Sequence, residues 1–154
     1  MARILKKIQD AISNRTTYRL GMLQTRVYRI LNQETAKALA PYGLMPPEWA
    51  MLGILADMPE GVRFSVVADE VGVEPPFVTL MAKKLLKMGL VEEKKDPDDS
   101  RAKLICVTAE GKKLVPIIEK HVRDAMRPLV GAIPRKDLLT YLSVLVELAD
   151  KKSK

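Results

Sequence analysis

The sequence predicts a mainly α-helical fold with a small β-hairpin, and three observations support this class. Apolar residues recur at helical spacing over most of the chain. Prolines and glycines divide this pattern into segments of ordinary helix length. Between residues 90 and 108 the pattern changes to two short strand-like runs joined by a turn-rich tip. With 154 residues and no low-complexity linker, the chain is expected to form one domain, 1–154.

The first two helices are predicted from apolar spacing and from proline. Over roughly residues 3–40, side chains such as Leu23 and Val27 stand one turn apart. Pro41 ends this run because it cannot continue the hydrogen-bond ladder. Pro46 can open the second helix, since an N–H in the first turn has no intrahelical partner to lose. That helix is expected to end at the next Pro-Glu-Gly stop.

A third, short helix is expected from Ser65, as its N-cap, to Gly72, and a fourth follows over residues 75–88. Two helices packed steeply across so short a turn need a small residue where they touch, which Ala68 supplies. They also favour glycine where the first helix ends left-handed. The apolar corner between them is filled by Val67, Val71, Val73, Val78 and Met81. These positions favour a helix-turn-helix over a generic helical hairpin.

The runs at 90–96 and 101–108 predict a β-hairpin, or wing, after the helix-turn-helix. Basic side chains near its tip suit a duplex backbone, and an arginine suits a narrow minor groove. These basic residues are Lys94, Lys95, Arg101 and Lys103. Carboxylates repel phosphate, so Asp98 or Asp99 is expected to pair with Arg101 or a backbone N–H and hold the tip in shape. The alternative is an ordinary solvated turn.

The rest of the chain predicts two more helices. Thr108 is expected to cap the fifth, and Pro128, Gly131 and Pro134 are expected to interrupt it. A sixth is expected over residues 135–150. The predicted order is therefore four helices, two strands and two helices.

Composition and charge exclude several classes of protein. With 47% hydrophobic and 29% charged residues the chain can bury a core, which excludes a disordered chain. A single cysteine excludes a disulfide scaffold and suits the cytoplasm, and no apolar run reaches the roughly 20 residues of a membrane span. The net charge is +7, and residues 1–40 hold eight Lys and Arg against two acidic residues. This balance favours a polyanionic partner such as nucleic acid.

The residue inventory offers no starting point for an enzyme. The run Gly111-Lys112-Lys113 lacks the upstream glycine and the Ser or Thr of a phosphate loop. One histidine, His121, makes neither a metal site nor a catalytic triad, and no Gly-x-Ser-x-Gly elbow is present. We therefore expect no catalytic residue, no metal and no cofactor.

The motifs of residues 44–118 resemble those of the MarR family of bacterial and archaeal transcription regulators. The matching motifs are GV-PP-VT at 72–79, GLV at 89–91, D-P-x-D-x-R-A at 96–102 and V-T-x-x-G at 107–111. The flanking helices are similar in length and character but not in diagnostic residues.

This resemblance implies a homodimer with a winged helix-turn-helix lobe over residues 44–107. The flanking dimerisation helices, 1–40 and 108–154, would interlock with those of the second copy. The resemblance also implies that residues 75–88 form the recognition helix, that Arg101 is the wing-tip arginine and that Asp99 steadies it.

Three residues depart from the family pattern. Glu74 stands where serine or a similar cap is common, and Phe77 and Leu80 stand where small polar or basic side chains usually face the bases. Phe and Leu cannot donate a bidentate hydrogen bond to a base and can at best contact a thymine methyl. On the recognition helix the expected DNA contacts are Pro76, Phe77, Thr79, Leu80, Lys83 and Lys84.

Members of the family often respond to small anionic or phenolic ligands bound beside the dimerisation helices. Candidate ligand residues here are Tyr18, Arg19, Tyr28, Trp49 and His121. Each also has an ordinary interpretation, as core for Trp49, dimer packing for the tyrosines and surface charge for Arg19. The cysteine-sensing branch resembles this chain less well, because its reactive cysteine lies in the first helix. Cys106 lies in the second wing strand, where we expect a packing role.

The expected function is that of a sequence-specific, homodimeric DNA-binding repressor at a pseudo-palindromic operator, released by a small aromatic or anionic ligand. One alternative is a winged-helix protein-interaction module that docks through Phe77 and Leu80. Salt dependence separates the two, because phosphate contacts weaken steeply with salt whereas apolar docking does not. A nonspecific DNA binder is the second alternative, and it would show no preference among sequences.

Overall fold

The computed structural model describes residue 6 and residues 17–99 and 101–150. The sequence predictions for residues 1–5 and 7–16 lie outside this part of the chain. The helices are α2 (Thr17–Leu39), α3 (Pro46–Asp57), α4 (Phe64–Val71), α5 (Pro75–Lys87), α6 (Ala109–Val130) and α7 (Arg135–Asp150), with a 3₁₀ turn, η1, at Ala40–Tyr42. The strands are β1 (Val62–Arg63), β2 (Val91–Lys95) and β3 (Lys103–Val107). The predicted mainly α-helical class with a β-hairpin is confirmed.

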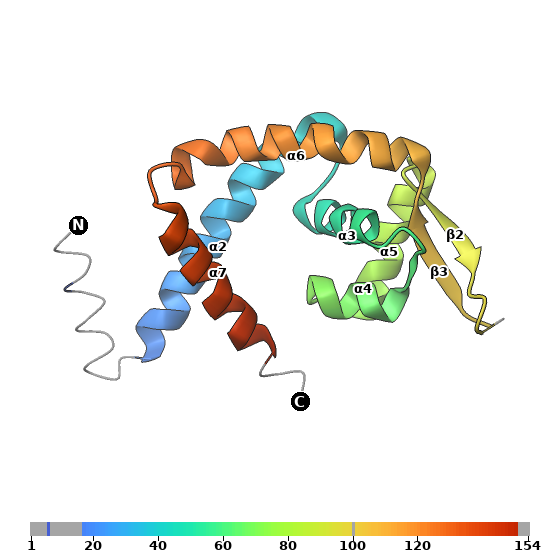
Figure 1. Cartoon of the computed structure of the whole chain (residues 1–154), viewed down its shortest axis with the longest axis horizontal. Helices are drawn as coiled ribbons and strands as arrows, with labels where there is room; N and C mark the ends of the chain where they lie inside the picture. Colours follow the sequence, from blue (N-terminus) through green and yellow to red (C-terminus); the bar gives the residue numbers. More distant parts are fainter. Residues whose placement is uncertain (1–5, 7–16, 100, 151–154) are drawn as a thin grey trace.

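The molecule has two parts joined by the long helix α6. At one end α3, α4 and α5 pack with the small sheet, and at the other α2 packs against α6 and α7 runs away from the end of α6 (Figure 1). Helix α6 contacts α2, α3 and β3, so it connects both parts. Within the described residues, no helix combines the length and apolarity that crossing a membrane requires.

One apolar core holds the three-helix part together. Helix α3 contributes Met51, Leu52 and Leu55, and the sheet contributes Ile105, all of them buried. Val67 and Ala68 of α4 pack into the same core with four side chains of α5, Val78, Met81, Ala82 and Leu85. Burying one such large aliphatic side chain contributes about 1.5–3 kcal/mol relative to leaving it in water.

The turn between α4 and α5 has the predicted geometry. Gly72 adopts φ +72°, a left-handed conformation that favours glycine. Its N–H donates to the carbonyl oxygen of Ala68 at 2.9 Å, and the N–H of Val73 donates to the same oxygen at 3.0 Å. Ala68 is buried at the contact between the helices. The helix-turn-helix prediction is therefore confirmed.

The sheet has three antiparallel strands in the order β1-β3-β2, one more than the sequence predicted. In the hairpin Val91 pairs with Val107 and Lys95 pairs with Lys103. The extra strand, β1, pairs its Val62 with Ile105. It has only two residues, too few for a sequence pattern, and becomes a strand only because β3 lies beside it.

Two of the helix-end predictions are wrong. Ser65 lies inside α4, whose N-cap is Arg63 without a side-chain cap bond. Pro128 does not interrupt α6, which continues to Val130 with this proline inside its last turn. This proline removes only the hydrogen bond to the carbonyl of Asp124, and the helix ends two residues later, so no further turn has to continue past it. Thr108 does cap α6, because its hydroxyl accepts the N–H of Gly111 at 3.1 Å.

Candidate nucleic-acid interface

Helix α5 has one buried face and one face in solvent. The buried face holds Val78, Met81, Ala82 and Leu85. The opposite face carries five of the six predicted contact residues, all exposed, which are Pro76, Phe77, Thr79, Leu80 and Lys83. A helix fixed along one side and open along the other has the form in which recognition helices enter a major groove.

The sixth predicted residue, Lys84, has a protein partner instead. Its ammonium donates to Oε2 of Glu48 at 2.6 Å, and Glu48 is buried on α3. The same oxygen accepts the backbone N–H of Met45 at 2.8 Å, which closes the first turn of α3. Lys84 thus fastens α5 to α3, and we leave it out of the proposed DNA contacts.

The tip of the wing is shaped by an aspartate, as the sequence predicted. Oδ1 of Asp99 accepts the backbone N–H of Arg101 at 3.0 Å. The carbonyl oxygen of Asp99 accepts the N–H of Ala102 at 2.9 Å. The Arg101 side chain is exposed, and no carboxylate pairs with it among the residues that the structure describes. Its guanidinium therefore stands at the tip with its hydrogen-bond donors available to a phosphate or base edge.

The three wing lysines differ in their partners. Lys103 on β3 pairs with Glu93 on β2 at 2.6 Å. Lys94 pairs with Glu92 at 3.1 Å, and this carboxylate raises the pKa of Lys94 above its ordinary value. Lys95 forms no ion pair within the described chain. Arg101 and Lys95 are therefore the wing cations that form no ion pair among the described residues, and Asp98 and Asp99 are two further carboxylates of the same loop.

An ion pair at the base of the wing was not predicted from the sequence. Nε of Arg63, on β1, donates to Oδ2 of Asp96 at 2.6 Å, and Asp96 is buried. Oδ1 of Asp96 also accepts the backbone N–H of Asp98 at 2.9 Å. These two donors, first the Asp98 N–H and then Arg63, hold the pKa of Asp96 below its ordinary value. The pair ties the extra strand to the start of the wing loop.

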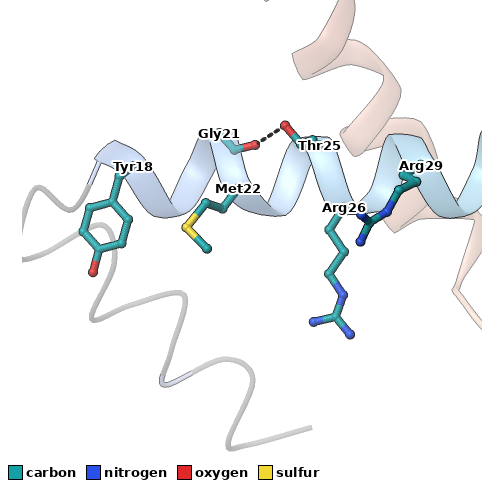
Figure 2. Close-up of a pocket in the computed structure, with 6 residues that line it drawn as sticks. All are labelled: Tyr18, Gly21, Met22, Thr25, Arg26 and Arg29. Carbon is teal, nitrogen blue, oxygen red and sulfur yellow. Dashed lines mark hydrogen bonds between the residues drawn. The ribbon is translucent and has the colours of Figure 1, made fainter.

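A hollow of about 490 Å³ lies along the first half of α2. Figure 2 shows its lining side chains projecting from one helix, with Tyr18 at one end and two arginines at the other. The lining residues are Tyr18, Gly21, Met22, Thr25, Arg26 and Arg29. Apolar and aromatic surface next to guanidinium groups suits a small aromatic anion.

The structure brings only one of the predicted ligand residues, Tyr18, to this hollow. Tyr28 is exposed on another side of α2, and Trp49 packs against the core from α3. His121 lies on α6, where its Nδ1 is 3.2 Å from the hydroxyl of Tyr42. The side chain of Arg19 lies outside the described part of the structure. The four that the structure describes, Tyr18, Tyr28, Trp49 and His121, therefore do not line one hollow within a single copy of the chain.

Cys106 is buried in β3, and its thiol lies 3.7 Å from the carbonyl oxygen of Glu60. This placement agrees with a packing role. Among the described residues, no three His, Cys, Asp or Glu side chains are grouped so that they could hold a metal ion.

Sequence reasoning missed residues of two kinds. Glu48 and Asp96 are charged groups that become buried, and their partners are far away in sequence. Arg26 and Arg29 could have been predicted from their spacing. They lie eight and eleven residues after Tyr18, which places all three near one face of a helix.

The sequence and the fold of this chain are similar to those of known transcriptional regulators. A family model described as "MarR family" matches residues 42–102. The HTH-type transcriptional repressor Rv2887 of Mycobacterium tuberculosis is 32% identical over 106 residues, which cover 69% of this chain and 76% of that protein.

Two solved structures from Rhodococcus show the same fold over most of the chain. CouR from Rhodococcus jostii RHA1, bound to p-coumaroyl-CoA, is 30% identical with a TM-score of 0.79, covering 84% of this chain and 91% of CouR. A MarR-family transcriptional regulator from Rhodococcus sp. RHA1 is 28% identical with a TM-score of 0.81, covering 86% of this chain and 95% of the other. The similarity therefore includes the flanking helices as well as the winged lobe.

Proposed function

The chain belongs to the MarR family of transcriptional regulators, and on this premise we propose that it represses transcription as a homodimer bound to a pseudo-palindromic DNA site. The observation that carries the proposal is the geometry of α5. Four buried side chains fix one face of this helix, and its other face is exposed to solvent. The wing, with an arginine at its tip, follows this helix in the sequence. Repression would follow from occupation of a promoter by the dimer in the cytoplasm.

The contacts divide into two kinds. Residues at the N-terminal half of α5 would lie against base edges, and Lys83 would contact phosphate. On the wing, Arg101 would enter the minor groove, where negative potential is strongest, and Lys95 would contact phosphate. Lys94 and Lys103 would contribute less, because each already pairs with a glutamate.

The dimer is supported by apolar surface that one copy leaves exposed. No residue of α7 is buried, although this helix carries Leu139, Leu142, Val146 and Leu148. On α2 the exposed apolar side chains include Met22, Leu23, Val27 and Ile30. Apolar surface of this extent in a soluble protein marks an interaction site. We assign α2, α6 and α7 to dimerisation and residues 44–107 to DNA binding.

Anisotropy of a labelled duplex tests the DNA-binding proposal. The duplex carries the DNA upstream of this protein's own coding sequence. Arg101→Ala should weaken binding by about 1–3 kcal/mol for each subunit of the dimer, the value of one good arginine contact, without changing the circular-dichroism spectrum. Arg123→Ala is the matched control, because it removes an exposed arginine from α6, and sedimentation velocity verifies that this variant keeps the assembly state of wild type. Equal affinities for wild type and Arg101→Ala would refute the wing assignment.

Release by an aromatic anion is the second element of the proposal. The α2 hollow supports it, and CouR, a relative of the same fold, binds p-coumaroyl-CoA. Tyr18 would stack on the ring and Arg26 and Arg29 would pair with the anionic group. A ligand acts on DNA binding only if it binds one spacing of the two lobes more tightly than the other.

Titration calorimetry with p-coumarate and p-coumaroyl-CoA as probes tests the hollow. Either probe should bind wild type, and Arg26→Ala should weaken binding at least fivefold while Arg123→Ala does not. The same probe should lower the affinity for the duplex. Binding that is identical in wild type and Arg26→Ala would place the ligand elsewhere.

The alternative of a protein-interaction module is not favoured, because the relatives of this chain are transcriptional repressors and regulators. The same relatives give no support for an enzyme, and we ascribe no reaction to the chain.

A further inference from the structure

The exposed face of α5 is apolar where a recognition helix is usually polar. Leu80 is 62% exposed and stands near the middle of this face, and Phe77, one turn earlier, is 39% exposed at its border. Pro76, also exposed, lies one turn before Leu80. Phe77 and Leu80 are neighbours on the helix surface and form one small apolar patch beside lysines, and an apolar patch rimmed by polar residues indicates a contact site.

The same stretch offers few hydrogen-bond donors to a base. The hydroxyl of Thr79 donates to the carbonyl oxygen of Pro75 at 3.3 Å, which leaves its methyl group and an acceptor. Glu74, the N-cap residue, is an acceptor only. The first charged donor on this face is Lys83, a full turn beyond Thr79. Direct reading by bidentate Arg, Asn or Gln contacts is therefore not available to the first two turns of α5.

Only one group on the floor of the major groove is apolar, and it is the C5-methyl of thymine. We propose that the first two turns of α5 recognise thymine methyl groups through Leu80, Phe77 and the methyl of Thr79. This inference rests on the proposed DNA binding and specifies what the helix reads. Each half-site of the operator would hold thymines under these side chains, on one or both strands.

Charge favours DNA over a protein partner for this face. Lys83 and Lys87 stand one and two turns beyond Leu80 and are both exposed. Within the described chain neither forms an ion pair, in contrast to Lys84 between them. Cations beside an apolar patch match a groove whose floor carries methyl groups and whose walls carry phosphates.

Replacing thymine by uracil tests the inference, because the two bases differ only by this methyl. The preferred half-site is first selected from randomised duplexes with wild-type protein. Each thymine is then changed singly to uracil, and affinity is measured by anisotropy. Burying a group of this size corresponds to about a fourfold change in affinity, so each contacted methyl should give about a fourfold loss.

Variants of the protein assign the methyl to the side chain. In Leu80→Ala, the uracil effect should disappear at the positions under Leu80 and persist elsewhere. Phe77→Ala should do the same for its own positions. Lys83→Ala is the matched control, because it should weaken binding to all sequences while leaving the uracil effect unchanged. These residues are exposed, so the variants should stay folded, as circular dichroism can verify.

The outcomes separate the inference from the function on which it rests. Tight, selective binding that is indifferent to uracil at every half-site position, or selection without thymine, would overturn methyl recognition and leave DNA binding intact. Failure of folded wild-type protein to bind any duplex at low salt would overturn both. In that case, the Leu80 and Phe77 face would belong to a protein partner.

Discussion

Substitutions at two neighbouring lysines of α5 should affect two different properties, the stability of the protein and its affinity for DNA. Changing each to methionine removes the charge and keeps most of the apolar stem. Lys84 contacts Oε2 of Glu48 at 2.6 Å, and the Glu48 side chain is only 9% exposed. Lys83 is exposed on the other side of the helix and forms no ion pair within the described residues. Lys84→Met should therefore lower stability, and Lys83→Met should lower DNA affinity.

The cost of Lys84→Met follows from the surroundings of Glu48. A hydrogen bond to a charged group contributes about 1.5–3 kcal/mol. The Lys84 side chain is 39% exposed, so water replaces part of the lost contact and the lower end applies. The Met45 N–H, at 2.8 Å, still donates to the carboxylate. We expect a loss of about 1.5 kcal/mol in the free energy of unfolding, with α5 less firmly held on α3.

The cost of Lys83→Met should appear only with DNA. Its effect on stability should stay within about 0.5 kcal/mol, as for most surface substitutions. A dimer would lose two phosphate contacts, one per subunit, so the slope of log affinity against log salt should fall by about 1.8, twice the value of about 0.9 for one contact.

Urea unfolding at a fixed protein concentration and anisotropy at several salt concentrations measure the two effects. A fixed concentration matters because dimerisation would couple to unfolding. A Lys84→Met protein that lowers the salt slope by about two, one phosphate contact per subunit, and leaves the unfolding midpoint unchanged would contradict this prediction. That result would make Lys84 a phosphate contact and the ion pair with Glu48 unimportant.

Three further predictions concern the wing and the dimer. A Cβ at Gly61 would overlap Sγ of Cys106 and lie 3.1 Å from the Ile105 oxygen, at a φ of +88°. Gly61→Ala should therefore cost about 3 kcal/mol in urea unfolding, and Cys106→Ala should restore part of it. Folding lowers the pKa of Asp96, so its contribution to stability is present at neutral pH and is lost as pH falls below about 4. Between pH 7 and 3 the urea midpoint of Asp96→Asn should consequently fall less than that of wild type; a parallel fall would contradict this. Leu142→Glu should give monomers in sedimentation velocity whereas Lys136→Glu should not, and dimers in both would exclude α7 from the interface.

The helix-turn-helix could be predicted from the sequence because its determinants are local. Gly72 ends α4, Ala68 permits the close approach, and Val67, Val78 and Met81 fill the corner. All lie within about 15 residues, so periodicity and turn chemistry describe them. The wing hairpin is local for the same reason, and Asp99 could be expected to bond a nearby N–H.

Apart from Arg26, Arg29 and the two helix ends, the missed features depend on residues far apart in the chain. Glu48 and Lys84 are separated by 36 positions, and Arg63 and Asp96 by 33. Strand β1 becomes regular only through pairing with β3. No local pattern specifies these contacts, because packing of the whole lobe brings the partners together.

Competition between specific and random DNA tests the central claim of sequence-specific repression most directly. Wild-type protein is bound to the labelled upstream duplex at several salt concentrations and challenged with a large excess of random duplex. We expect affinity that falls steeply with salt, two chains per duplex and resistance to the competitor, because specific sites bind roughly 10³-fold or more tighter than nonspecific ones. Equal displacement by random DNA, or no binding at low salt by folded protein, would contradict it.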